Sequence, residues 1–169
     1  MARKPARGKP GPARRSLGEG GRKIVAENRQ IPYKYHVLER MEAGLALTGT
    51  EVKALREGRA TLRDAYALIK SGEAWLLNCH ISPYSHSGYA GHDPLRTRKL
   101  LLHREEIGKL RGRVEEKGLA LVPVRLYFKN GRAKCELALV KGKKVWDRRE
   151  EVRRRAADRE IEQELKRYR

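Results

Sequence analysis

The central part of the chain alternates apolar and polar residues with the two-residue period of β-strands. Tyr33, Tyr35 and Val37 alternate with charged or polar neighbours. This alternation predicts a pair of strands over residues 33–40 and 43–47.

Two further pairs of apolar segments flank short turn signals. DAYALIK and EAWLLNC flank Ser-Gly and predict a β-hairpin over 64–79. LVPVRLYFK and RAKCELALV flank Asn-Gly, the pair preferred in type I′ turns, and predict a hairpin over 121–140. Pro123 is expected at the edge or start of a strand, because proline cannot donate to a sheet.

Helical spacing is found in two short segments between the predicted strands. Thr48 precedes Glu51 by the spacing of a capping box, and Gly58 predicts the end of that helix. HREEIGKLRGRVEEKG, over 103–118, has apolar residues on one helical face and ends with Gly118. Many short strands with few helices predict a mainly β fold, a small antiparallel barrel, because closure protects strand edges.

Charge indicates the kind of partner. The 169 residues include 40 Lys and Arg against 21 Asp and Glu, a net charge of +19. Such an excess repels itself in a compact body, so an abundant polyanion is expected as partner, with nucleic acid ahead of an anionic membrane surface.

The composition also divides the chain into three parts. Residues 1–23 contain Gly, Pro, Arg and Lys with almost no large apolar group, which predicts a disordered basic arm. Residues 24–140 carry the strand and helix periods and form the predicted barrel. Residues 141–169 are rich in charge and poor in large apolar groups, which predicts a basic tail.

No targeting or disulfide signal accompanies this organisation. No stretch approaches the roughly 20 apolar residues of a membrane span, and the basic start lacks the apolar run of a signal peptide. Cys79 and Cys135 are interpreted as small apolar residues on strands. A cytoplasmic protein is expected.

The search for enzymatic motifs favours a non-enzyme without a cofactor or metal. There is no phosphate-binding loop, nucleophile elbow or paired-histidine helix. His80, His86 and His92 leave a metal-assisted nuclease with Asp93 as an alternative, but the intervening Gly and Ser predict a solvated loop.

Basic residues beside an apolar strip favour contact with RNA. In HDPLRTRKLLLH, Arg96, Arg98 and Lys99 precede three leucines, so we expect a cationic surface anchored to a buried strip. Together with Tyr84 and Tyr89, these cations suit phosphate contact and base stacking.

The basic tail predicts a marginal helix. Asp147 and Glu150 are placed to cap its start, and Glu150 pairs favourably with Arg154. Its apolar stripe is thin, so the helix is expected to form against a partner. The alternative is an amphipathic helix docked on its own barrel.

Long segments of the chain are similar to one known family. NRQIPYKYHVLE, GLALTGTEVKALREGRATLRDAYALIKSGEAWLLNCHISPY, HDPLRTRKLLLH, GLALVPVRLYFKNGRAKCELALVKGKK and WDRRE resemble the SsrA-binding protein family, small protein B. The resemblance implies an oligonucleotide-binding-like barrel that binds the tRNA-like domain of transfer-messenger RNA. It also implies delivery with elongation factor Tu to stalled ribosomes for trans-translation.

The resemblance also implies two groups of functional residues. On the barrel, the implied RNA-binding residues are Asn28, Arg29, Glu51, Lys53, Arg96, Arg98, Lys99, Leu101 and Lys134. In the tail, the residues implied to occupy the empty decoding centre and mRNA channel of the small subunit, as a helix, are Gly142, Lys143, Lys144, Trp146, Asp147, Arg148 and Arg149. The family's usual Asp-Lys-Arg order appears here as Asp-Arg-Arg. A basic structural ribosomal protein that binds rRNA is the alternative function.

Overall fold

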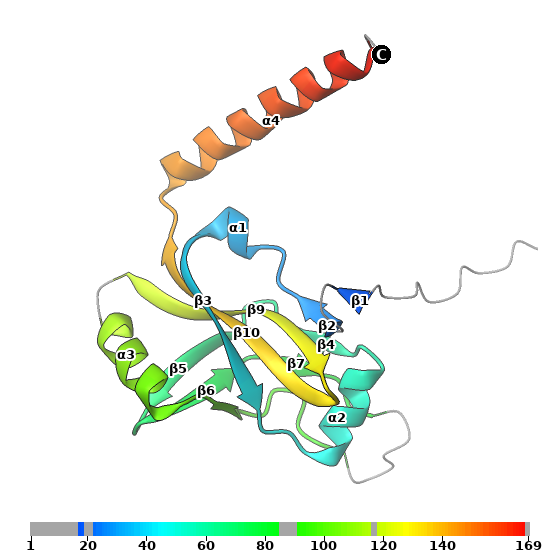
Figure 1. Ribbon diagram of the computed structural model, residues 1–169, viewed down its shortest axis with the longest axis vertical. Coiled ribbons are helices and arrows are strands. Elements are labelled where there is room, and N and C mark those ends of the chain that lie inside the picture. The colour runs from blue at the N-terminus through cyan, green and yellow to red at the C-terminus, as the bar shows by residue number, and fades with distance from the viewer. Residues whose placement is uncertain (1–16, 19–21, 85–90, 116–117, 168–169) are drawn as a thin grey trace, which may run out of the picture.

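The computed structural model describes residues 17–18, 22–84, 91–115 and 118–167. Its elements, in chain order, are β1 (Leu17–Gly18), β2 (Arg22–Glu27), α1 (Ile31–Lys34), β3 (Tyr35–Leu45), α2 (Gly49–Arg56), β4 (Ala60–Thr61), β5 (Tyr66–Lys70), β6 (Glu73–Leu77), β7 (His80–Ile81), β8 (Arg98–Leu101), α3 (Arg104–Val114), β9 (Leu119–Lys129), β10 (Arg132–Gly142) and α4 (Val145–Arg167). Figure 1 shows the strands gathered into one body with α1, α2 and α3 beside it, while α4 extends away from it.

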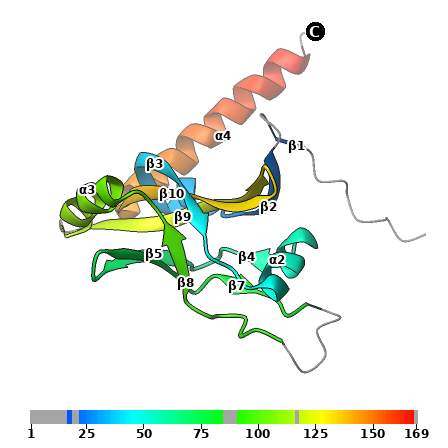
Figure 2. The ribbon, with the colours of Figure 1, turned by 60° about the horizontal axis from the view of Figure 1, so that its bottom comes forward.

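The main sheet closes into an antiparallel barrel. Its strand order is β1-β2-β9-β10-β3-β8-β6-β5, and β5 also pairs with β9 through Ala67 and Leu121. That last pairing closes a ring from β9 to β5, while β1 and β2 extend the sheet beyond it. The strands β4 and β7 form a separate small sheet beside α2 (Figure 2). The predicted fold class, a small antiparallel barrel with short helices, is confirmed.

Apolar residues are buried on both faces of β9 and β10. Leu121 and Leu137 belong to the large cluster inside the barrel. Val122 and Val140 point the other way and pack with Ile31 of α1 in a second, smaller cluster. Because both faces are covered, β9 is apolar almost continuously rather than at every second position.

Both predicted hairpins are confirmed, with β5 paired to β6 and β9 to β10. Asn130 and Gly131 at the tip of the second hairpin have φ angles of 50° and 75°. Positive φ at both central residues is the requirement of a type I′ turn, which matches the right-handed twist of the strands.

The predicted strand pair over 33–40 and 43–47 is wrong, because β3 is one continuous strand. Its residues pair with β10 from Tyr35 opposite Gly142 to Gly44 opposite Lys134. No turn-forming residue interrupts the chain between 40 and 43, and the long partner strand β10 pairs with β3 on both sides of that point. The preceding residues form α1 instead, where Pro32 suits the first helical turn.

The expected position of Pro123 is also wrong, because it lies well inside β9. The register against β10 shifts there: Arg125 faces Glu136 and Pro123 faces Leu137, which leaves Val124 as an extra residue. A bulge is the place inside a sheet where a residue without an N–H is tolerated.

Both predicted helices inside the barrel domain are confirmed. Thr48 begins α2 with its capping box, and Gly58 follows its end with a φ of 76°. His103 begins α3, and its backbone N–H donates to Glu106 at 2.8 Å. Gly118, expected to end α3 directly, lies beyond its last residue, Val114.

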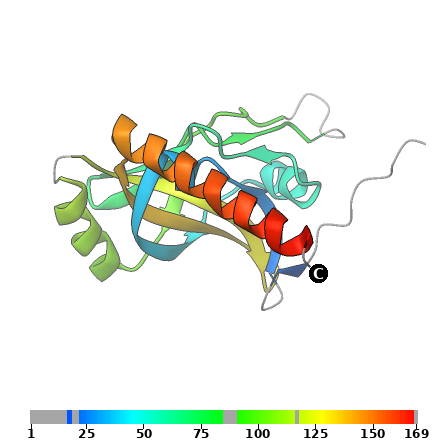
Figure 3. The same cartoon turned by 90° about the horizontal axis from the view of Figure 1, so that it is seen from above.

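The terminal segments differ in how much of them the structure describes. The predicted basic arm, 1–23, is wrong at its end, because residues 17–18 form β1 and pair with residues 22–23 of β2. The rest of the arm lies outside the described residues, so its disorder stays a prediction. The tail contains α4, which leaves the barrel at the end of β10 (Figures 1 and 2) and, seen from above, runs across it toward the β1 side (Figure 3). It does not dock along the barrel surface. None of the described helices is long and apolar enough to cross a membrane.

Two glycine substitutions should change stability in opposite directions. Gly131→Ala should lower the free energy of unfolding by about 1 kcal/mol, because alanine is strained at positive φ. Gly108→Ala in α3 should raise it by about 0.5–1 kcal/mol, since an added Cβ there meets no atom within 4 Å. Urea unfolding measures both values, and shifts of the same sign would contradict this account of the turn.

Candidate RNA-binding site

The first turn of α2 holds a buried carboxylate, Glu51. Its Oε2 accepts a hydrogen bond from the backbone N–H of Thr48 at 2.8 Å. Arg96 donates to both of its oxygens, through Nε at 3.1 Å and Nη2 at 2.7 Å, and Arg98 donates through Nε at 2.9 Å. We call Glu51, Arg96 and Arg98 the Glu51 cluster.

Arg98 is buried as completely as Glu51, with 0% of either side chain exposed. The Nη1 atom of Arg98 donates to the carbonyl oxygens of Cys79 at 2.6 Å and Arg96 at 2.9 Å, and Nη2 donates to that of Pro94 at 3.2 Å. A buried charge is tolerated when it is paired and its N–H groups are hydrogen-bonded, as here.

The ionisation of the Glu51 cluster follows from these contacts. Burial raises the pKa of Glu51, but hydrogen bonds from Arg96 and Thr48 and the charges of Arg98 and Arg96 outweigh it, so the pKa is about 2. The hydrogen bond to Glu51 in turn raises the pKa of Arg96. At neutral pH the cluster therefore carries one net positive charge.

Burial corrects the expected roles of two predicted residues. The sequence places Arg98 in a cationic surface and the resemblance places Glu51 among the RNA-binding residues, yet neither side chain reaches solvent in this structure. Both instead hold Arg96, which has 39% of its side chain exposed. The leucine strip is corrected too, because strand alternation turns Leu100 inward and leaves Leu101 53% exposed.

Two predicted lysines lie beside aromatic rings. The Lys53 Nζ on α2 is 5.5 Å from the centroid of the Tyr84 ring, and the Lys99 Nζ on β8 is 6.0 Å from that of Trp75. Attraction to the ring face restricts where each ammonium group lies. Tyr89, the second predicted stacking residue, lies outside the described residues.

Leu101 and Lys134, far apart in sequence, line one groove of about 380 Å³. Val52 of α2 and Arg132 at the hairpin tip lie on the same groove. A Cβ at Gly44 would stand 3.1 Å from the Cβ of Leu101, so glycine allows β3 and β8 to pass closely here. We call this the leucine groove.

Glu42 on β3 is a functional candidate that the sequence did not reveal. Its carboxylate accepts a hydrogen bond from the Tyr127 hydroxyl and lies 3.4 Å from Lys129 Nζ and 3.5 Å from Lys134 Nζ. The hydrogen bond from Tyr127 lowers the pKa of Glu42, and the two lysines add to this effect against burial. Glu42 therefore fixes Lys134 at the leucine groove. The available signal in the sequence was an acidic residue, Glu42, in a chain whose strand segments are rich in Lys and Arg.

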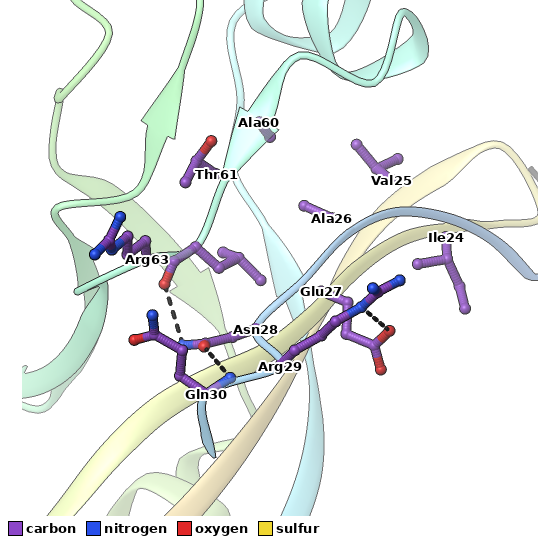
Figure 4. Close-up of a pocket in the computed structure, with 11 residues that line it drawn as sticks. Ile24, Val25, Ala26, Glu27, Asn28, Arg29, Gln30, Ala60, Thr61 and Arg63 are labelled. Atoms are coloured by element: carbon purple, nitrogen blue, oxygen red, sulfur yellow. Dashed lines mark hydrogen bonds and ion pairs between the residues drawn. The ribbon is translucent and has the colours of Figure 1, made fainter. Parts of the chain in front are cut away.

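Asn28 and Arg29 line a second groove, of about 560 Å³, between the end of β2 and β4 (Figure 4). The Asn28 Nδ2 donates to the Leu62 carbonyl at 3.2 Å, and its Oδ1 accepts from the Gln30 N–H at 3.1 Å. These bonds tie the strand end to the facing segment. Arg29 is 89% exposed. We call this the β2–β4 groove.

The grooves and the Glu51 cluster lie on one side of the barrel. Figure 1 shows β2, β4, α2 and the tip of the β9–β10 hairpin gathered there, and Lys23 of β2 reaches the Arg56 carbonyl of α2 at 3.5 Å. Asn28 and Arg29 line one groove on this side, and Leu101 and Lys134 line the other. Glu51 and Arg98 are buried, and Lys99 lies beside Trp75 and Glu73 of β6 instead.

The metal-nuclease alternative does not fit the histidine contacts. The His92 Nδ1 is 3.0 Å from Thr50 Oγ1, and its Nε2 is 3.0 Å from the Ile81 carbonyl, so both ring nitrogens are engaged. Asp93 accepts from the Leu95 N–H at 3.0 Å. Among the described residues no group of three His, Cys, Asp or Glu side chains could hold a metal ion. His86 lies outside them.

The base of the tail is attached to α1 and β3. The Lys143 N–H donates to the Lys34 carbonyl at 3.0 Å, and its Nζ donates to that of Pro32 at 2.7 Å. Asp147 accepts from the Lys144 N–H at 3.1 Å and lies 3.7 Å from His36 Nε2. Asp147 therefore caps α4, as predicted.

The remaining predicted tail residues lie around this attachment. Gly142 ends β10, and Arg149 is an exposed residue of α4. Trp146 and Arg148 belong to the first turns of α4, and their side chains are outside what the structure describes.

A closed barrel with preorganised cations on one side is typical of small nucleic-acid-binding barrels. Residues 25–167 match the family described as SmpB protein. The chain is 54% identical over 149 residues to the SsrA-binding protein of Trichodesmium erythraeum (strain IMS101), covering 88% of this chain and 96% of that protein. It is 56% identical over 144 residues to the SsrA-binding protein of Pelotomaculum thermopropionicum (strain DSM 13744 / JCM 10971 / SI), covering 85% and 94%.

A solved structure shares the fold. It is described as "tmRNA-SmpB: a journey to the center of the bacterial ribosome" and is 49% identical, with a TM-score of 0.61 over 70% of this chain and 84% of that chain. This chain belongs to the SmpB family.

Replacing Glu51 should destabilise the fold and change its response to acid. Glu51→Gln leaves Arg98 buried without its counter-charge and should cost about 3–5 kcal/mol. The folded-state pKa of about 2 lies below the ordinary 4.5, so the Glu51 contribution is present above pH 4.5 and is lost as pH falls toward 2. The variant should therefore lose less stability over that range.

Denaturant unfolding at several pH values measures both effects. Glu73→Gln is the control, since Glu73 pairs with Lys99 where both side chains are more than 40% exposed. The control should cost under about 1 kcal/mol. An equal loss in both variants would contradict the assigned importance of the Glu51 cluster.

Proposed function

We propose that this protein binds the tRNA-like domain of transfer-messenger RNA, the SsrA RNA, and delivers it to stalled ribosomes for trans-translation. The observation that carries the proposal is the family match, which spans the barrel and α4 together. Relatives named SsrA-binding protein match over most of their own length. The related solved structure names tmRNA, SmpB and the ribosome.

The cationic side of the barrel is the proposed RNA-binding face. Lys53, Arg96 and Lys134 are each held by an aromatic ring or a carboxylate, so their positions are set before RNA arrives. Fixed cations suit the phosphates of a folded RNA, whose backbone geometry is itself fixed. The proposed face also includes Asn28, Arg29, Lys99 and Leu101. Glu51 and Arg98 are buried beneath it and position Arg96.

The tail is proposed to probe the ribosome. We infer that Gly142 to Lys144 and the first turns of α4, including Trp146, Asp147, Arg148 and Arg149, enter the empty decoding centre and mRNA channel. An exposed helix rich in arginine fits an RNA-lined channel, and mRNA already present would exclude it sterically. That the tail becomes helical only when it binds the ribosome stays a prediction.

In this proposal the protein acts by binding alone, in the cytoplasm, and performs no reaction. Its contact with elongation factor Tu is indirect, through the RNA. No observation favours the alternative of a structural ribosomal protein.

Charge reversal on the proposed face should weaken binding to SsrA RNA. Lys53→Glu should reduce affinity about tenfold or more at about 0.15 M salt and lower the salt dependence, because phosphate contacts are lost. Lys109→Glu, an exposed lysine of α3 on another side of the barrel, should change affinity by less than about threefold. Gel-shift competition measures both. Wild-type protein that bound SsrA RNA no better than random RNA would refute the proposed function.

Removal of the tail should separate binding from rescue. A chain ending at residue 145 should bind SsrA RNA within about threefold of the full chain, because the barrel face remains. Peptide tagging on stalled ribosomes should be lost. Tagging by the shortened chain, or loss of both activities together, would contradict separate roles for barrel and tail.

A further inference from the structure

The end of β2 forms a ridge between two grooves. On one side lies the β2–β4 groove. On the other side, the same residues, Glu27, Asn28 and Arg29, line a groove of about 290 Å³ that α1, β3 and β9 complete. Tyr33, Arg40 and Arg125 lie on this second groove, which we call the tyrosine groove. The family resemblance assigned none of these three residues a role.

The tyrosine groove carries fixed positive charge. The Nε of Arg125 donates to Glu27 at 2.8 Å, and the Nη1 of Arg40 donates to Glu136 at 3.2 Å. These carboxylates hold the two guanidinium groups, while 40% and 54% of the arginine side chains stay exposed. With Arg29 on the ridge, three arginines and one acid, Glu27, line the groove, so its lining carries two net positive charges.

The groove also has an aromatic wall and an apolar floor. Tyr33 is 52% exposed although it is a large aromatic residue. Below it, Ile31 and Val124 are buried in the small apolar cluster, and Val37 packs against them. An exposed ring beside arginines is the combination that stacks an unpaired base and neutralises its phosphate.

We propose that the tyrosine groove binds one unpaired nucleotide of RNA, with its base on Tyr33 and its phosphate on Arg40 and Arg125. Continuity favours this occupant, because the ridge that bears Arg29 is shared with the β2–β4 groove of the RNA-binding face. An unpaired strand crossing the ridge would place neighbouring nucleotides in the two grooves. The inference rests on the proposed function and adds a distinct contact to it.

The test uses full-length variants with matched controls. Tyr33→Ala should weaken binding of a short single-stranded uridine oligonucleotide about 5- to 150-fold, and Tyr33→Phe should restore it, because the ring stacks. Arg40→Gln should lower the slope of log affinity against log salt by about 0.7, and Arg40→Lys should keep the slope. The readouts are fluorescence anisotropy and crosslinking of iodouridine to Tyr33.

The control variants remove the same kinds of side chain from other parts of the barrel. Tyr66→Ala removes another exposed tyrosine, on β5. Arg113→Gln breaks an ion pair with Glu39 in which Arg113 is 53% exposed, almost the same as Arg40. Thermal unfolding checks that all variants fold. Equal losses in the variants and their controls, or unchanged oligonucleotide binding by Tyr33→Ala, would overturn the proposal.

Longer RNAs then identify the source of the nucleotide. Weaker binding of free SsrA RNA by Tyr33→Ala and Arg40→Gln would place the nucleotide in that RNA. Normal binding of free SsrA RNA, with weaker binding to ribosomes, would place it in ribosomal RNA. Normal binding of both would overturn the proposal. Binding of the oligonucleotide does not depend on a preference for SsrA RNA. Failure of the proposed function is therefore seen in a different experiment, in which random RNA competes as well as SsrA RNA for the wild-type protein.

Discussion

The buried ion pair between Glu51 and Arg98 is the constraint on which the cationic side of the barrel depends. A carboxylate with no exposed surface requires positive partners, and a buried guanidinium requires acceptors for its N–H groups. Glu51 meets these needs while capping α2, so one side chain joins the helix start to β8. Arg96, which is partly exposed, takes its position from this pair. The residue that caps α2 therefore also sets the position of a cation at the surface.

The same arrangement recurs where the barrel carries exposed basic residues. Glu42 holds Lys134, Glu27 holds Arg125, and Glu136 holds Arg40. In a chain with net charge +19, these acids reduce repulsion within the barrel and also restrict the motion of the cations. Cations that are already ordered lose less entropy when RNA binds, so in the proposed function the acidic residues would aid recognition without touching the RNA.

The sequence predicted elements whose signals are local and missed features that depend on distant partners. The Asn130-Gly131 turn and the Thr48 to Glu51 capping box were recognisable because each needs particular residues at fixed spacing. The burial of Arg98 was missed, although the alternation of β8 places Arg98 on the same face as the buried Leu100. The leucine groove could not be foreseen, because Leu101 and Lys134 meet only through the pairing of β3 with both β8 and β10.

The position of α1 connects the proposed RNA-binding face to the tail. Arg29 precedes Gln30, the N-cap of α1, and the carbonyls of Pro32 and Lys34 in α1 accept hydrogen bonds from Lys143. Ile31 fixes this turn on the outer face of β9 and β10, so α1 cannot move without opening the small apolar cluster. In the proposed function, the backbone at Arg29 therefore has a set position relative to the base of α4. The barrel fixes where the tail begins, and the Asp147 cap with its His36 contact fixes how the helix starts.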